Sequence, residues 1–214
     1  MKNSTFRNYF VGALMLVLVF GVAQATYAVD AIPYGPPGYN NTTYSFIAAN
    51  TGNIVAYFES KSADYVTEIG LLVNGNPTGI FGLNNQTSIQ GNFLNLGPVN
   101  QNDTLVFVLR NVSPLGLDVF SDPALNGSFD LSGTDHNHIY STPYTGDPLR
   151  DAIPNGTYVG FEDLQFPNSD FDYNDENFIF TNVATNKVPE PSSILLLGAG
   201  LLGAGLLRRK IRLS

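Results

Sequence analysis

The sequence predicts an all-β protein: a single, jelly-roll-like β-sandwich, preceded by an N-terminal signal helix and followed by a C-terminal transmembrane helix. Short apolar, β-branched runs recur along the middle of the chain, and Asn-Gly, Gly-Asn, Asn-Asn and Ser-Pro pairs typical of turns separate them. Only 13% of the residues are charged, and no window has the periodicity of an amphipathic helix. The expected strands are residues 44–49, 54–59, 65–73, 104–110, 138–141, 157–163 and 178–183.

The middle of the chain is strongly acidic. Between residues 26 and 190, four basic residues stand against all 18 acidic ones, which gives this part a formal charge of −14. Such a charge repels nucleic acid and anionic lipid and attracts metal cations. The alternative is that the acidity only keeps an extracellular protein soluble. The chain has no cysteine, so a disulfide scaffold is excluded.

The N-terminus has the three parts of a secretory signal. Lys2 and Arg7 form a positive region, residues 10–23 are apolar, and Ala23 and Ala25 frame an A-x-A cleavage site. We therefore expect signal peptidase and the export machinery to process residues 1–25, with cleavage after residue 25 or 28. The apolar run is short for a membrane anchor, which needs about 20 residues. An irregular lead-in, residues 26–43, is expected to follow, and then the sandwich over residues 44–184.

Residues 185–214 form a separate tail. Pro189 and Pro191 make its start stiff and extended, and residues 194–207 contain only Ile, Leu, Gly and Ala. A helix of these 14 residues is about 21 Å long, and it spans a bilayer core of about 30 Å with help from flanking residues and snorkelling arginines. The positive cluster at residues 208–210 stays cytoplasmic, which places the body outside the inner membrane.

This tail resembles the PEP-CTERM sorting signal. The resemblance implies cleavage by an exosortase, a Gram-negative host and an environment rich in exopolysaccharide. The residues that carry it are Pro189, Glu190 and Pro191, the Gly/Leu-rich span, and Arg208, Arg209 and Lys210.

One stretch concentrates chemistry that favours a metal ion. Asp170, Asp172 and Asn174 have the i, i+2, i+4 spacing at which side chains of a curled loop point inward, and Ca²⁺ takes six to eight oxygen ligands. The spacing resembles the start of an EF-hand loop, although Asp175 stands where that loop has Gly. A solvated Asx turn is the alternative. Zn²⁺ is disfavoured because only His136 and His138 are present. The candidate Ca²⁺ ligands are Glu162, Asp163, Asp170, Asp172, Asn174 and Asp175.

A second resemblance covers residues 130–184. The Phe-Glu-Asp motif ending at Asp163 and the Asp-Tyr-Asn-Asp motif ending at Asp175 look like those of domain of unknown function 4114, with Glu176 and Asn177 as a departure from its apolar continuation. The resemblance implies a surface β-domain with calcium sites.

Two functions compete with a structural role at the cell surface or in the extracellular matrix. A calcium-dependent carbohydrate-binding module would use an exposed aromatic near the acidic loop, and Tyr173 is the candidate; a core position for Tyr173 is the alternative. A glycoside hydrolase would pair Glu162 with Asp172 or Asp175. The density of carboxylates is more typical of a cation cage, so we expect no enzymatic activity and no nucleic-acid partner.

Overall fold

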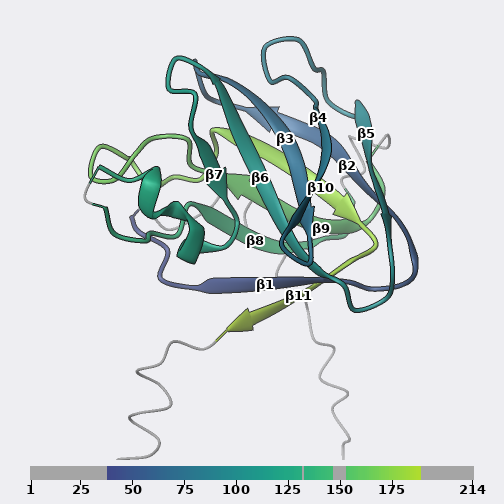
Figure 1. Ribbon diagram of the computed structural model, residues 1–214. Helices are drawn as coiled ribbons and strands as arrows, with labels where there is room; N and C mark the ends of the chain where they lie inside the picture. Colours follow the sequence, from purple (N-terminus) through teal and green to yellow (C-terminus); the bar gives the residue numbers. More distant parts are fainter. Residues whose placement is uncertain (1–37, 132, 147–152, 189–214) are drawn as a thin grey trace, which may run out of the picture.

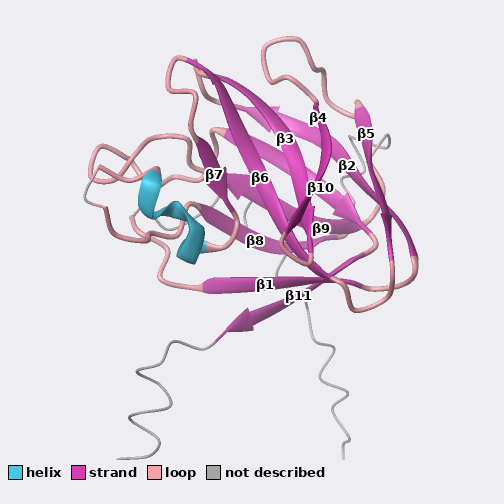
Figure 2. Cartoon of the chain, viewed as in Figure 1, coloured by secondary structure: helices cyan, strands magenta, loops and turns pink. Residues whose placement is uncertain are grey.

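The computed structural model describes residues 38–131, 133–146 and 153–188 (Figures 1 and 2). They form strands in two antiparallel sheets and one short 3-10 helix, so the body is all-β. The elements are β1 (Thr43–Ala48), β2 (Gly52–Lys61), β3 (Val66–Val73), β4 (Asn76–Gly82), β5 (Phe93–Val99), β6 (Thr104–Ser113), β7 (Asp118–Phe120), η1 (Pro123–Ser128), β8 (Ile139–Tyr144), β9 (Gly156–Phe161), β10 (Glu176–Thr181) and β11 (Val183–Val188).

The chain crosses repeatedly between the two sheets. Sheet A has the order β11-β1-β6-β3-β4, with β7 paired to β6, and sheet B has the order β5-β2-β10-β9-β8. Because β9 and β10 are antiparallel neighbours, the end of β9 lies beside the start of β10. The loop that joins them carries the acidic motifs.

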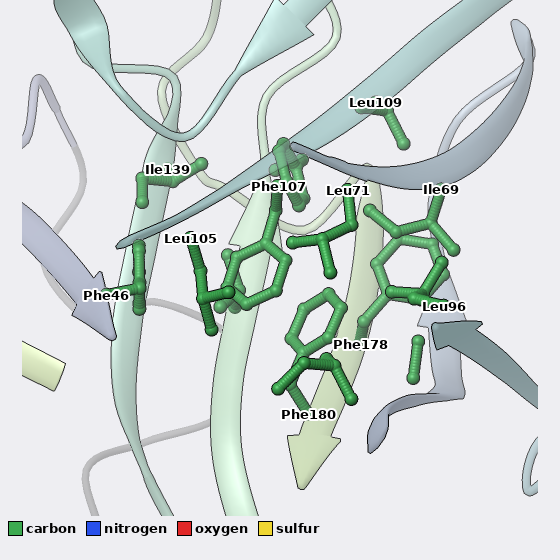
Figure 3. Packing of buried hydrophobic residues seen from close by; sticks show 14 of the residues in the cluster. Phe46, Ile69, Leu71, Leu96, Leu105, Phe107, Leu109, Ile139, Phe178 and Phe180 are labelled. Carbon is green, nitrogen blue, oxygen red and sulfur yellow. The ribbon is translucent and has the colours of Figure 1, made fainter. Parts of the chain in front are cut away.

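The core lies between the sheets, as a sandwich requires. Phe107 of β6 stacks on Phe180 of β10 with ring centroids 3.7 Å apart, and Ile69 and Leu71 of β3 belong to the same cluster (Figure 3). Burying a Leu, Ile or Phe side chain contributes about 1.5–3 kcal/mol, so these contacts are the main force that holds sheet A to sheet B.

A smaller cluster covers the other face of sheet B. Tyr158 and Ile179 point away from the main core and pack with Tyr140, Tyr144 and Tyr173. Both faces of β9 and β10 are therefore buried, which explains why residues 158–159 of β9 and 178–180 of β10 are apolar in succession instead of alternating with polar residues.

Each run predicted as a strand overlaps a strand of the structure, but four strands were missed. Three of them, β4, β5 and β11, are edge strands. Their sequences contain Pro, Gly or polar residues, such as Pro77 in β4 and Pro98 in β5, which edges tolerate because one side of the strand has no ladder to complete. The fourth, β7, has only three residues. The jelly-roll-like connectivity stays a prediction.

The body continues past residue 184. In sheet A, β11 pairs with β1 along its whole length, and Val188 lies opposite Thr43. The chain therefore enters and leaves the body at the same end of this sheet edge. The signal helix and the transmembrane helix fall outside the described residues. Within the described ranges, no helix is long and apolar enough to cross a membrane.

Candidate metal centre

The acidic motifs lie in one long loop at an end of sheet B. Glu162 and Asp163 directly follow β9, and Asp170, Asp172 and Asp175 precede β10. The backbone of Asp175 is fixed on two sides, because its N–H donates to Phe161 O at 3.2 Å and its carbonyl accepts from Ser62 N at 3.0 Å. Sheet pairing thus brings both ends of the loop together.

The loop curls through two residues in the left-handed region. Phe171 has φ of 57° and Tyr173 has φ of 52°, which costs non-glycine residues on the order of 1 kcal/mol each. The Tyr173 side chain anchors this conformation: its ring is fully buried, and its hydroxyl accepts a 2.7 Å hydrogen bond from Asn40 N. The backbone carbonyl of Tyr173 lies against Gly160, where a Cβ atom would come within 2.3 Å of it.

Three of the six predicted ligands converge. Each of Glu162, Asp170 and Asp172 offers a carboxylate oxygen, and these oxygens lie within 4.8 Å of one another. Asp170 is exposed, Asp172 is half-buried and Glu162 is fully buried, so the group reaches from the surface inward. Glu162 Oε2 is buried and has no hydrogen-bond partner.

Asp163 and Asp175 extend the cluster inward. The N–H of Asp163 donates to Asp175 Oδ2 at 2.8 Å, and Asp163 Oδ2 is a second buried carboxylate oxygen with no hydrogen-bond partner. None of the ion pairs among the described residues involves these side chains. The negative charge is thus not balanced by any described basic side chain.

The pKa values follow from this crowding. Burial, reinforced by Asp175 and Asp170, raises the pKa of Glu162 to about 9. Burial and Asp175 raise the pKa of Asp163 to about 8, and burial raises the pKa of Asp175 to about 6. Burial disfavours a charged carboxylate, and neighbouring carboxylates disfavour it further. The site therefore favours either protons or a cation.

Asn174 orients Asp172, one of the candidate ligands. Its side-chain Nδ2 donates to Asp172 Oδ2 at 2.5 Å, and its N–H donates to Asp172 Oδ1 at 3.2 Å. The second bond is the Asx turn that the sequence offered as an alternative to a metal loop. The turn is present, and it leaves the Asp172 carboxylate beside those of Glu162 and Asp170.

Sequence reasoning missed Glu176. It has no exposed surface; its Oε1 accepts 2.8 Å hydrogen bonds from Thr67 Oγ1 and Asn85 Nδ2, and its Oε2 has no partner. Burial raises the pKa of Glu176 well above its usual value, and the negative charge of Asp163 raises it further. The signal in the sequence was an acidic residue two positions before the apolar run of residues 178–180.

Asn177 and Asp130 were also missed, and both position the loop. Asn177 Nδ2 donates to Asn174 O at 3.1 Å, while its Oδ1 accepts from the Tyr158 hydroxyl at 2.6 Å. Asp130 Oδ1 accepts from Phe166 N at 3.0 Å and lies 2.9 Å from His138 Nε2. The rings of His136 and His138 thus both contact the Asp130 carboxylate, and His138 Nδ1 also lies 3.2 Å from the backbone carbonyl of Glu162.

The suggested sugar contact at Tyr173 is not supported. The ring has no exposed surface and packs beside Phe171 in the smaller cluster. The loop turns this side chain toward sheet B because the apolar surface there needs a cover, so Tyr173 offers no face on which a sugar stacks.

An all-β body with a carboxylate-rich loop defines the class of protein only coarsely. Residues 187–210 match the PEP-CTERM protein-sorting motif. The match includes the predicted sorting residues Pro189, Glu190, Pro191, Arg208, Arg209 and Lys210, which lie outside the described residues. No curated protein and no solved structure matches the chain. The resemblance to domain of unknown function 4114 receives no support from these comparisons and stays a prediction. The motif indicates an exported protein that an exosortase sorts through its C-terminus.

Proposed function

We propose that this protein is a surface or extracellular-matrix protein of a Gram-negative bacterium and that Ca²⁺ stabilises its β-sandwich. Signal peptidase removes the leader, and the C-terminal helix holds the chain in the inner membrane with the body on the periplasmic side. Exosortase then cleaves near Pro189, Glu190 and Pro191. The processed body serves in the envelope or in a biofilm, together with exopolysaccharide. The sorting motif supports the export route.

One observation carries the calcium part: Glu162 Oε2 is buried without a partner, next to the carboxylates of Asp170 and Asp172. An ionised carboxylate removed from water costs several kcal/mol unless a charge or hydrogen bonds compensate it. Ca²⁺ supplies that charge, and the flexible, oxygen-only donor set suits it. Asp175 and Asp163 add oxygens from the inner side.

A structural role fits this geometry better than glycoside hydrolysis. A glycosidase acid must reach the glycosidic oxygen of its substrate. Glu162 has no exposed surface, and its raised pKa arises from burial inside the body. We therefore propose that the carboxylates bind a cation and do not catalyse a reaction.

Thermal unfolding of the body, residues 29–188, tests the calcium site. Saturating Ca²⁺ at about a hundredfold excess over its Kd adds about 2.7 kcal/mol, which raises the melting temperature by several degrees above its value in EDTA. Asp172→Asn is expected to abolish this rise. Asp122→Asn, which removes one negative charge while Asn keeps the cap on Ala124 N, is the matched control and retains the full rise. A rise that survives Asp172→Asn, or no rise in the wild type, contradicts the proposal.

Processing in a host that has an exosortase tests the sorting step. The wild-type chain is expected to lose its C-terminal Arg-Arg-Lys cluster. An epitope added after Ser214 reports this cleavage, because antibodies no longer detect it on the processed chain. Replacing Pro189, Glu190 and Pro191 by Ala should leave the full-length chain in the membrane fraction. Equal loss of the epitope in both chains would rule out cleavage directed by this motif.

A further inference from the structure

A separate hollow lies on the side of the sandwich where β4 and β5, the edge strands of the two sheets, meet. It has a volume of about 560 Å³ and is lined by Glu68, by the loop between β4 and β5, and by Phe93. The loop, residues 83–92, arches beyond the ends of the strands (Figure 1). None of the candidate calcium ligands lines the hollow.

Hydrogen bonds within the loop, and from the loop to residues 65 and 67, hold the loop that lines this hollow. Asn85 is almost fully buried, donates to Tyr65 O at 2.7 Å and accepts from Thr67 N at 3.0 Å. The carbonyl of Asn84 accepts from Ser88 N at 2.8 Å. A ligand that binds here therefore meets a formed wall, and little affinity is lost to ordering the loop.

The lining is polar but almost uncharged. Asn84 and Asn92 use their side-chain oxygens to accept from Gln86 N and Ile89 N within the loop, each at 3.0 Å. Their NH₂ groups make no hydrogen bond with any described residue and remain available as donors. Hydroxyls of the loop and the carboxylate of Glu68 supply acceptors. No lysine or arginine lines the hollow.

Phe93 gives this polar hollow an apolar platform. Its side chain is 67% exposed, and the Tyr57 ring, 5.8 Å away between centroids, supports it. Ile89, on the loop, is 70% exposed. An aromatic ring beside convergent amide and hydroxyl groups matches a pyranose, which has C–H bonds on one face and hydroxyls around its rim.

Other ligand classes fit less well. An anionic ligand would find no basic side chain and would meet Glu68. A metal ion would find a single carboxylate where Ca²⁺ needs six to eight oxygens. An extended peptide pairing with the edges would meet Pro77 and the left-handed Gly79 in β4 and Pro98 in β5, which interrupt the ladder.

We propose that this hollow binds a neutral polysaccharide, with Phe93 as the stacking platform and Asn84, Asn92 and Glu68 as hydrogen-bonding partners. No residue that lines the hollow is a candidate calcium ligand, and we expect the two sites to act independently.

Affinity electrophoresis of the body tests this proposal, in gels that contain dextran, a mixed-linkage β-glucan or galactomannan, with alginate as the acidic comparison. At least one neutral polymer is expected to retard the wild type. Phe93→Ala should weaken the apparent affinity about tenfold or more, Phe93→Tyr should restore it, and Val112→Ala, a truncation at another exposed strand residue, should leave it unchanged.

Absence of retardation in every neutral gel, or equal retardation of the wild type and Phe93→Ala, overturns the proposal, as does retardation by alginate alone. All gels contain Ca²⁺, and the Asp172→Asn variant is run beside the wild type. Retardation of that variant equal to the wild type is expected, because the hollow lies outside the calcium centre. Loss of retardation in Asp172→Asn would contradict that independence.

Discussion

The hydroxyl of Thr67, on β3 of sheet A, donates a 2.8 Å hydrogen bond to Glu176, on β10 of sheet B. Asn85 donates to the same carboxylate oxygen, also at 2.8 Å. A buried carboxylate thus connects the two sheets at the end where the acidic loop lies. The other oxygen of Glu176 has no partner, so this connection also places an uncompensated charge, or a proton, beside the candidate metal centre.

Glu176→Gln is expected to stabilise the metal-free body at pH about 8. Gln keeps the oxygen that accepts from Thr67 and Asn85 and removes the need to bury a charge or to take up a proton. The gain is on the order of 1 kcal/mol, and Thr67→Val, which removes a donor, should instead lower stability. Urea unfolding in EDTA measures both changes. A Gln variant less stable than the wild type would contradict this expectation.

Stability of the metal-free body should fall as the pH rises from about 5 to about 9. The folded-state pKa values of Glu162, Asp163 and Asp175 are raised to about 9, 8 and 6 by burial and mutual repulsion. Their contribution to stability is fully present below their usual pKa values near 4 and is lost as the pH passes the raised values, because the unfolded chain releases these protons more readily.

Saturating Ca²⁺ should remove this pH dependence, because the cation stabilises the ionised carboxylates. Unfolding free energies at pH about 5, 7 and 9, in EDTA and in Ca²⁺, provide the measurement. Glu162→Gln should flatten the curve recorded in EDTA. A metal-free body whose stability rises over this range would be inconsistent with buried, crowded carboxylates.

Gly160→Ala should displace the acidic loop. The added Cβ would lie 2.3 Å from Tyr173 O and 2.8 Å from Asn177 Oδ1, and backbone cannot yield as a side chain does. The expected loss is about 1–3 kcal/mol, together with a weaker response to Ca²⁺. Gly82→Ala is the control, because its Cβ would contact only the flexible Leu94 side chain, at 3.2 Å. If the two substitutions lower stability and the response to Ca²⁺ equally, Gly160 has no special role in placing the loop.

Asn177 and Tyr158 should act as a coupled pair. Asn177→Ala leaves the Tyr158 hydroxyl and Asn174 O without partners, which costs about 1–3 kcal/mol. Tyr158→Phe alone leaves only Asn177 Oδ1 unpaired. The double variant should therefore be less destabilised than the sum of the single ones, with a coupling of about 0.5–3 kcal/mol in chemical denaturation. Strict additivity would mean that the hydrogen bond contributes nothing.

Local patterns in the sequence were sufficient for the β class, for the interior strands and for the position of the acidic loop. Apolar, β-branched runs such as the one around Phe107 and the turn pairs between them are local signals. The sorting motif is also local, since its recognition depends on the order and spacing of residues in one short segment. For the same reason the edge strands β4, β5 and β11 were missed: an edge needs no apolar run.

Only the tertiary structure decided which acidic residues meet and which aromatic residues are exposed. Glu176 depends on Thr67, 109 positions away, and on Asn85, 91 positions away. Tyr173 turned inward because the outer face of sheet B required a cover, whereas Phe93 stayed at the surface. Burial is set by how the two sheets pack and by where each loop returns. Both are sums of long-range contacts that no short stretch of sequence contains.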